Sequence, residues 1–245
     1  TFQKLTESLK PGTAIQFSGY GEPFLNDQLE AFLDHAHTLR LAEHLQINSN
    51  FGAVSENRIR ELLNHPFERL VISLDAMDRD TFKVYKGCDE FDRVFSHLRI
   101  LSEEIKKRGR ARQEIVVQMT VTRKNVHQRQ NFIDTITGMG MIPRLKQLNT
   151  HHSFPDKDKV VEFEVTDLSR YKRAAYSRLC EWVWGGMAMF WNGDVTVCCQ
   201  DPTGSRIYGN IHENTTTDLL NSNARRCDFR RIYFADPGQI DICRN

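Results

Sequence analysis

The sequence predicts an α/β fold with a parallel β-sheet, followed by a small α+β module. Five short apolar runs rich in β-branched residues alternate with amphipathic helical patterns over the first 150 residues, which is typical of βαβ units. The hydrophobic period then changes after a polar, proline-containing stretch at residues 151–167. Three cysteines, Cys180, Cys198 and Cys243, lie beyond that stretch and set the second part apart from the first.

The elements of the first part follow one another in a regular order. The predicted strands cover residues 14–19, 44–50, 69–76, 114–122 and 141–148. The predicted helices cover residues 27–41, 55–65, 91–109 and 128–139, with a short helical turn at 80–85. Ser55 is placed to cap the second helix through its hydroxyl. These elements form a predicted core domain over residues 1–150.

The second part begins after a predicted linker at residues 151–168 and covers residues 169–245. A helix leads to Cys180, and two short strands flank Asn192-Gly193, which is the strongest short-range signal of a β-hairpin. A last short helix is predicted at residues 221–229. A module of this size usually needs a metal to supplement its hydrophobic core.

The composition is that of a soluble globular protein, with 40% hydrophobic and 27% charged residues in 245. No run of about 18 apolar residues predicts a membrane span, and no signal peptide is visible. The net charge of +1 gives no reason to expect nucleic acid, and the basic run at residues 106–112 is expected to be a solvated helix end. Six cysteines without a secretion signal favour a reducing, cytoplasmic location.

The cysteines of the second part indicate a metal site. Thiolates are the ligands that select zinc or an iron–sulfur cluster, and Cys180, Cys198 and Cys243 are the expected ligands. The fourth ligand is either Cys199 or a residue beyond Asn245, since the final Cys-Arg-Asn begins a C-x-x-C that the chain ends too early to complete. Cys88 and Cys227 lack ligand neighbours and are expected to be buried or incidental thiols.

Ligands of parallel α/β sheets bind at the carboxyl ends of the strands, and unusual residues follow the first strand. Gly19 and Gly21 allow close approach of the backbone. Glu22, next to Pro23, could hold an ammonium group together with exposed carbonyls. The alternative is a Gly-Pro turn with a surface glutamate.

The other strands end in hydroxyl, amide and carboxylate groups, which suit a ribose and an amino-acid moiety. These residues are Asn48, Ser49, Asn50, Ser73, Asp75, Gln118, Thr120, Thr122, Gln147 and Asn149. Taken separately, Ser73 and Asn50 are better explained as helix caps.

Three segments together resemble the radical S-adenosylmethionine (SAM) enzymes with a C-terminal SPASM or shortened "twitch" auxiliary-cluster domain. FSGYGEPFLN is similar to the family's glycine–glycine–glutamate motif, with Tyr20 in place of the first glycine. VISLDAMDRDTFKVYKG resembles one of the family's strands and the turn that follows it, with Ala76 for a glycine and Lys86 for an arginine. CEWVWGGMAMFWNGDVTVCCQD, followed by GNI, resembles the auxiliary domain.

The resemblance implies a partial (β/α)6 TIM-like barrel whose first βα unit is missing, leaving about five of six strands. The family's C-x3-C-x2-C loop, which holds the catalytic [4Fe–4S] cluster, does not occur in the chain. The chain is therefore expected to be a fragment cut at both ends and inactive as given; otherwise the protein is not catalytic.

The resemblance also implies a role for each candidate residue. Gly19, Gly21, Glu22 and Pro23 would surround the SAM amino group, Ser73 the ribose or methionine, and Lys86 the SAM carboxylate as a point charge. The remaining cofactor-site residues are Asn48, Asn50, Asp75 and Gln118. Cys180, Cys198 and Cys243 would hold an auxiliary [4Fe–4S] cluster, and Trp182, Trp184 and Trp191 are expected to cover it rather than to stack on bases.

The implied activity is formation of a 5′-deoxyadenosyl radical, hydrogen abstraction, and oxidation or modification of a peptide, sugar or aminocyclitol. A reductant such as flavodoxin or ferredoxin would supply the electron. Two alternatives stay open: a non-catalytic iron–sulfur or zinc module, and an ordinary TIM-barrel enzyme using Asp75, or His151 and His152, in acid–base catalysis. The two histidines are expected to be solvated, because they fall in the polar linker.

Overall fold

The structure is a computed structural model that describes residues 2–7, 9, 12–19, 21–40, 44–109, 112–148, 180–201, 203–221, 223–236 and 239–240. The chain divides into two compact units. The sheet unit holds the described residues of Lys10–Leu148, and the C-terminal unit holds those of Thr1–Leu9 and Asp167–Asn245. The predicted linker and the predicted helix before Cys180 lie outside the described residues.

The sheet unit contains a five-stranded parallel sheet with the order β1-β2-β3-β4-β5. Its strands are β1 (Ile15–Phe17), β2 (Leu45–Ser49), β3 (Arg69–Ser73), β4 (Glu114–Val121) and β5 (Ile142–Gln147). All five predicted strands are present, which confirms the expected α/β class. Because each strand lies beside its neighbour in sequence, every connection winds in the same sense and places its helix on the same side of the sheet.

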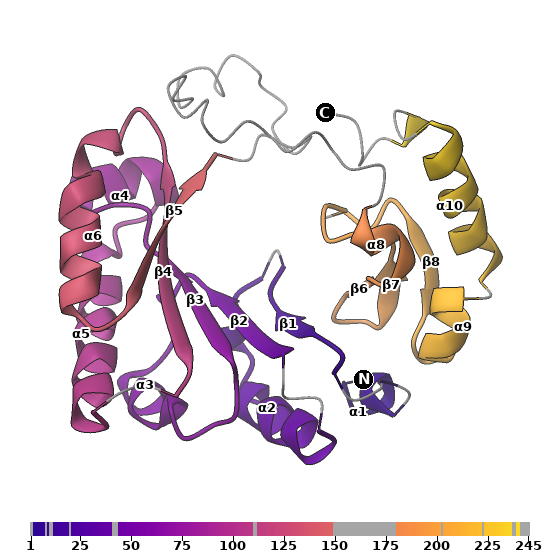
Figure 1. The fold of residues 1–245 in the computed structure, drawn as a ribbon, viewed down its shortest axis with the longest axis horizontal. Coiled ribbons are helices and arrows are strands. Elements are labelled where there is room, and N and C mark those ends of the chain that lie inside the picture. Colours follow the sequence, from indigo (N-terminus) through magenta and orange to yellow (C-terminus); the bar gives the residue numbers. More distant parts are fainter. Residues whose placement is uncertain are drawn as a thin grey trace. The chain divides into compact units, whose positions relative to one another are not determined.

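The helices of this unit lie along one face of the sheet (Figure 1). They are α2 (Leu29–Thr38), α3 (Glu56–Leu62), α4 (Arg79–Lys86), α5 (Phe91–Lys107) and α6 (Arg129–Gly138), with 3-10 turns η1 (Pro23–Leu25) and η3 (Val126–Gln128). Ser55 caps α3 as predicted, since its hydroxyl accepts a hydrogen bond from Arg58 N. The short turn expected at 80–85 is a two-turn helix, because Asp78 caps its start and Gly87, at φ 70°, ends it.

The two faces of the sheet differ in chemistry. Along β4, Val117, Met119 and Val121 are buried, while Gln118 and Thr120 between them are half-buried. Strand alternation therefore sends the apolar set toward the helices and leaves the opposite face polar. We call this opposite side the polar face; it carries Gln46, Asn48, Ser73, Gln118, Thr120, Arg144 and Lys146, which are related by the strand register.

The C-terminal unit is a small α+β module built on an antiparallel sheet of β6 (Ala188–Met189), β7 (Asp194–Thr196) and β8 (Ile207–Asn210). Its helices are α1 (Phe2–Thr6), α8 (Glu181–Trp184), α9 (Thr216–Asn221) and α10 (Ala224–Ala235). The hairpin predicted around Asn192-Gly193 joins β6 to β7, and Gly193 has a φ of 90°. The last helix begins later and runs longer than predicted, because Asn223 caps it.

One apolar cluster forms the core of the C-terminal unit. It contains Val183, Val195, Val197, Tyr208, Ile211, Leu219, Phe229, Tyr233 and Ile240. Leu5 of α1 packs against this cluster, as do Cys180 and Cys198. Neither α1 nor β8 was predicted from the sequence. None of the described helices is long and apolar enough to cross a lipid bilayer.

Candidate functional site

Glu22 ties the loop after β1 to the end of β2. Its Oε1 accepts hydrogen bonds from the Ser49 hydroxyl at 2.7 Å and from Phe24 N at 3.2 Å, while Oε2 accepts one from Asn50 N at 2.7 Å. Both carboxylate oxygens are therefore bound to donors of the protein. Glu22 is half-buried and, by these hydrogen bonds, fixes the shape of the loop. Gly19 in the same loop has a φ of 129°, a conformation that favours glycine.

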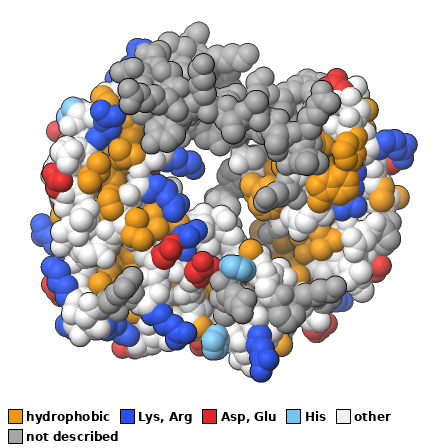
Figure 2. All heavy atoms as spheres, viewed as in Figure 1, with side chains coloured by type: hydrophobic (Ala, Val, Ile, Leu, Met, Phe, Trp, Pro, Cys, Tyr) orange, Lys and Arg blue, Asp and Glu red, His pale blue; other side chains and the backbone are white. Residues whose placement is uncertain are grey.

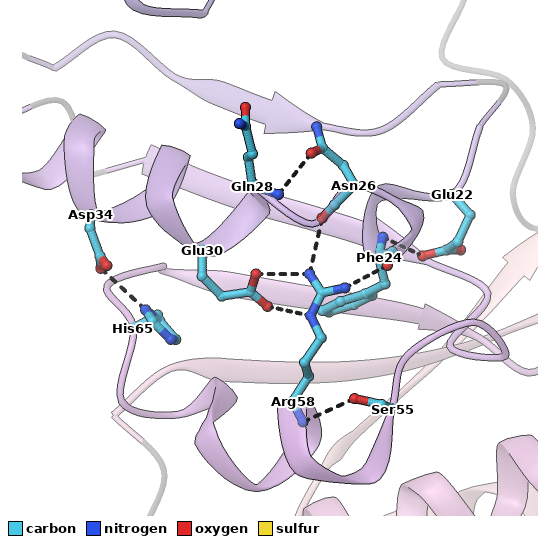
Figure 3. A network of polar contacts seen from close by, with 9 residues as sticks. All are labelled: Glu22, Phe24, Asn26, Gln28, Glu30, Asp34, Ser55, Arg58 and His65. Carbon is cyan, nitrogen blue, oxygen red and sulfur yellow. Dashed lines mark hydrogen bonds and ion pairs between the residues drawn. The ribbon is translucent and has the colours of Figure 1, made fainter.

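Arg58 holds this loop from the other side (Figure 3). From α3, its Nε and Nη2 atoms donate to the two carboxylate oxygens of Glu30 at 2.9 and 2.8 Å. Nη1 also donates to Phe24 O at 2.6 Å and Nη2 to Asn26 O at 3.1 Å, with the guanidinium 5.3 Å from the centre of the Phe24 ring. The loop is thus clamped at both ends. Sequence analysis missed Arg58, because nothing local marks its long-range partners.

Asp75 and Lys86 form a largely buried ion pair at the end of β3. Lys86 Nζ lies 2.6 Å from Asp75 Oδ2, and Asp75 Oδ1 accepts a hydrogen bond from Thr120 N at 2.6 Å. Asp75 also has a positive φ of 64°, which is unusual for a residue other than glycine. Burial and the charge of Asp75 raise the pKa of the neighbouring Tyr85 to about 12.

The ion pair of Lys86 and Asp75 affects two predictions: that Lys86 binds the SAM carboxylate, and that Asp75 acts in acid–base catalysis. An ammonium group has three donors, so Lys86 can bind a carboxylate of a ligand only in addition to Asp75. Asp75 is 3% exposed and both its oxygens accept hydrogen bonds, which is a poor arrangement for a general base. His151 and His152, the other residues considered for acid–base catalysis, lie outside the described residues.

Several of the other predicted polar residues lie on the polar face, whereas Ser49 and Gln147 have the opposite strand parity and Asn149 lies outside the described residues. The Gln118 amide donates to the Ser73 hydroxyl at 2.8 Å, and the Gln46 amide donates to Asn48 Oδ1 at 2.8 Å. Asn50 Oδ1 accepts from Gly52 N at 2.9 Å. The interpretation of Ser73 and Asn50 as helix caps is wrong, since Ser55 and Asp78 cap the helices that follow.

Asn125 joins the ends of β3 and β4 and was not predicted. Its side chain is completely buried, and its amide donates to Asp75 O at 2.8 Å and Thr120 O at 2.9 Å. Its Oδ1 accepts from Thr122 N at 2.7 Å. The amide therefore replaces the sheet hydrogen bonds that end where the strands diverge. The sequence signal was a Thr-x-x-Asn directly after a strand.

In the C-terminal unit, two of the three predicted metal ligands come together. Cys180 precedes α8, Cys198 follows β7, and both are half-buried against the same core. A hydrogen bond with Cys199, then burial, raise the pKa of the Cys198 thiol, and the charge of Cys180 acts in the same direction. Cys243 lies outside the described residues, and within those residues no set of three or more ligands is complete.

The sulfur atoms of Cys198 and Cys199 already accept hydrogen bonds from Gln200. The Cys198 sulfur accepts a hydrogen bond from Gln200 N at 3.4 Å, and Cys199 Sγ accepts one from the Gln200 amide at 3.9 Å. The hydrogen bond from Cys198 lowers the pKa of Cys199 to about 7. Thiolates that receive backbone N–H groups are suited to an iron–sulfur cluster. The thiols present thus fit the predicted group.

Asp201 organises the loop that carries these thiols. Its carboxylate accepts hydrogen bonds from Thr196 Oγ1 at 2.6 Å, from Ser205 N and Oγ at 2.8 Å each, and from Arg206 N at 2.9 Å. Burial alone would raise the pKa of Asp201, but these hydrogen bonds lower it below its ordinary value. Asp201 therefore holds the two ends of the loop between β7 and β8 together.

The remaining cysteine and tryptophan predictions have mixed outcomes. Cys88 and Cys227 are exposed rather than buried, which leaves the interpretation as incidental thiols. Trp191 is 91% exposed, so it covers no described part of the metal site. Trp184 is also exposed, and its ring lies 5.2 Å from that of Phe234.

Comparisons with known proteins identify one domain family and several similar folds. Residues 180–245 match the family model of the SPASM domain, described as an iron–sulfur cluster-binding domain. A solved structure of BtrN in complex with AdoMet and 2-DOIA is similar, with a TM-score of 0.57 and 18% identity over 100% of this chain and 77% of BtrN. Streptococcus suis SuiB is similar at a TM-score of 0.62 and 15% identity, over 86% of this chain and 56% of SuiB.

The fold is therefore similar to that of BtrN and SuiB. Residues 180–245 form a SPASM domain, which confirms the auxiliary-domain part of the resemblance found in the sequence. One curated relative, the uncharacterized protein MJ0804 of Methanocaldococcus jannaschii, is 29% identical over 97 residues. These residues are 39% of this chain and 33% of MJ0804, so the match spans a third of that relative.

Proposed function

We propose that this chain is part of a radical SAM enzyme, with a SAM site at the carboxyl ends of the strands and an auxiliary [4Fe–4S] cluster in the SPASM domain. The observation that carries the proposal is the SPASM match over residues 180–245, in which Cys180 and Cys198 pack on one core. In the sequence, the SPASM domain follows a parallel sheet whose polar face carries several of the residues that we propose for the cofactor site.

SAM and a reduced [4Fe–4S] cluster together supply a 5′-deoxyadenosyl radical that removes a hydrogen atom from a substrate. The protein's residues bind and orient the cofactor. Backbone oxygens of the clamped loop from Gly19 to Pro23 receive the SAM amino group, and Lys86 attracts the carboxylate while it stays paired with Asp75. Asn48, Asn50, Ser73 and Gln118 offer hydroxyl and amide groups to the ribose.

In the SPASM domain, Cys180, Cys198 and Cys243 are the proposed cluster ligands. Cys199 or a residue beyond Asn245 completes the set. The Gln200 N–H, which already donates to Cys198 Sγ, would stabilise the thiolate form of this ligand. Asp201 holds the segment in place.

The substrate we propose is a peptide, sugar or aminocyclitol, and the net reaction is an oxidation or another modification. A reductant such as flavodoxin or ferredoxin supplies electrons, nucleic acid and membranes are not partners, and the protein works in the cytoplasm. The C-x3-C-x2-C motif that would hold the catalytic cluster does not occur in these 245 residues.

A zinc-binding module is the second candidate, because thiolates also suit zinc. The two candidates differ in SAM binding, which equilibrium dialysis of the complete, anaerobically reconstituted protein measures. We expect saturable binding of SAM that weakens when Ser73→Ala removes a hydroxyl from the polar face. Ser96→Ala, an exposed change on α5, is the matched control. A colourless protein that contains zinc and does not bind SAM would overturn the proposal.

A further inference from the structure

Two cations on the polar face of the sheet have no acidic partner among the residues that the structure describes. Arg144 and Lys146 are exposed residues of β5. Among the described residues, neither makes an ion pair or a side-chain hydrogen bond. Figure 2 shows Lys and Arg side chains on the part of the sheet unit where β5 lies. They are two residues apart on one strand, so their Cα atoms are about 7 Å apart and both side chains leave the same face.

The strand register places these cations beside the proposed cofactor site. Arg144 is the neighbour of Gln118, and Lys146 is the neighbour of Thr120. Gln118 in turn lies beside Ser73 and donates a hydrogen bond to its hydroxyl. Arg144 is thus two strands, or about 10 Å, from Ser73. A ligand that reaches across the polar face from Ser73 would meet the guanidinium.

Other charges on this side of the sheet have partners. Lys86 pairs with Asp75 at 2.6 Å, and Arg69 pairs with Glu114 at 2.6 Å. Glu22 receives three hydrogen bonds from the protein. Two like charges near each other repel, so an unpaired pair of cations leaves a local positive potential that an anion would neutralise.

The anion is not the carboxylate of SAM. In the proposed site the SAM amino group binds after β1, and the carboxylate is attached to the same carbon atom. From β1 to β5 there are four strand spacings, or about 19 Å along the sheet. In the proposed function the SAM carboxylate already has Lys86 as its cation, so an anion bound by Arg144 and Lys146 would belong to a second ligand.

We propose that Arg144 and Lys146 form an anion-binding subsite for the substrate, which therefore carries a carboxylate or a phosphate group. Arg144 can bind either oxyanion with two parallel N–H donors, and Lys146 adds a second charge. The proposal rests on the proposed function, since it takes the polar face as the place where substrate meets SAM.

The test is equilibrium dialysis of the complete, anaerobically reconstituted protein against radiolabelled inorganic phosphate and, separately, radiolabelled succinate. SAM is present, and chloride keeps the ionic strength constant. The double variant R144Q/K146Q removes the subsite. The control R99Q/K106Q removes the same two charges from exposed positions on α5, so that long-range electrostatics is matched.

We expect saturable binding of one anion per chain, weakened at least about 10-fold in R144Q/K146Q and unchanged in R99Q/K106Q. Preference for phosphate would identify a phosphorylated substrate, and preference for succinate a carboxylate. Both variants change exposed side chains and are expected to fold, and titration of the unchanged protein tests the proposal without any variant.

Three results would overturn the subsite. The first is binding that does not saturate in the unchanged protein, as expected if the cations only protect an edge strand from association. The second is equal binding by the two double variants. The third is loss of SAM binding together with the anion in R144Q/K146Q, which would assign the cations to SAM. Failure of the unchanged protein and of both double variants to bind SAM would instead reject the proposed function. The anion titration would still decide whether the subsite exists.

Discussion

The guanidinium of Arg226 lies inside the C-terminal unit with Nη1 2.8 Å from the hydroxyl oxygen of Tyr208. Arg226 is 1% exposed, and within the described part of the chain no carboxylate contacts it. Its Nη2 atom instead donates to backbone carbonyls around α8, including Gly186 O at 2.8 Å. Arg230 donates to Val183 O at 3.0 Å. Helix α10 therefore fixes the segment that begins directly after Cys180.

Replacing Arg226 is expected to loosen this segment. Arg226→Gln removes several hydrogen bonds from a charged donor and leaves buried carbonyls without partners, which costs about 3 kcal/mol. Denaturant unfolding, monitored by tryptophan fluorescence, measures this loss of stability. All three tryptophans of the chain, at positions 182, 184 and 191, lie in this unit. Arg231→Gln, an exposed change on the same helix, should stay within about 0.5 kcal/mol. Equal unfolding midpoints for the two variants would contradict the role of Arg226.

The clamp on the loop after β1 is expected to act on SAM affinity. Arg58→Lys keeps the charge but cannot hold both oxygens of Glu30 and two carbonyls at once. The loop from Gly19 to Pro23 would then be less ordered before binding, and we expect the Kd of SAM to rise about 10-fold. Arg60→Lys, on the same helix, should leave the Kd unchanged. Calorimetric titration of the complete protein that finds identical affinities would rule out this positioning role.

Asn125 is expected to be important for stability of the sheet unit. Asn125→Ala leaves Asp75 O, Thr120 O and Thr122 N without the partner that each has now, and we expect a loss of about 2 to 3 kcal/mol. Asn131→Ala, an exposed change on α6, serves as the control. Hydrogen exchange at β3 and β4 reports the local effect, and unchanged protection there would refute it.

Asp78 is expected to make α4 sensitive to acid. The hydrogen bond from Thr81 N is the main cause that lowers the pKa of Asp78 below its ordinary value of 3.8, and burial opposes it. A lowered folded-state pKa contributes stability that is fully present above the unfolded-state value. This contribution disappears as the pH falls through the lower folded-state pKa.

The measurement is denaturant unfolding of the wild type and Asp78→Ala at a series of pH values. Near neutral pH the variant should be less stable by about 1 kcal/mol, because it loses an N-cap. The difference should shrink as the pH falls below the ordinary value of 3.8. Asp80→Asn, in the same helical turn, should not show this trend. A difference that does not depend on pH would show that the charge of Asp78 is unimportant.

Local patterns were sufficient to predict the elements of the sheet unit. The five strands lie within the predicted ranges because apolar β-branched runs alternate with helices, and Ser55 and Asn192-Gly193 carry their own signals. β8 was missed because Ile207–Asn210 is short and contains a glycine. The end of α10 was missed because its polar residues, such as Arg230, face inward toward carbonyls, which reverses the usual hydrophobic pattern.

The site was predictable only where its residues have local signatures. Glycine and cysteine spacing pointed to the loop after β1 and to Cys180 and Cys198. The partners of Arg58, Asn125 and Arg226 are far away in sequence, so no local pattern indicates them. The pairing of Lys86 with Asp75 likewise depends on how the segment after β3 places the last turn of α4.

Iron and acid-labile sulfide per chain test the central claim most directly. In the complete protein, reconstituted anaerobically, we expect a brown protein that loses one cluster's iron and sulfide in both Cys180→Ser and Cys198→Ser. Cys227→Ser, a change of an exposed thiol on α10, should retain the full amount. Equal iron and sulfide in all three variants, or a colourless protein that holds only zinc, would contradict the account.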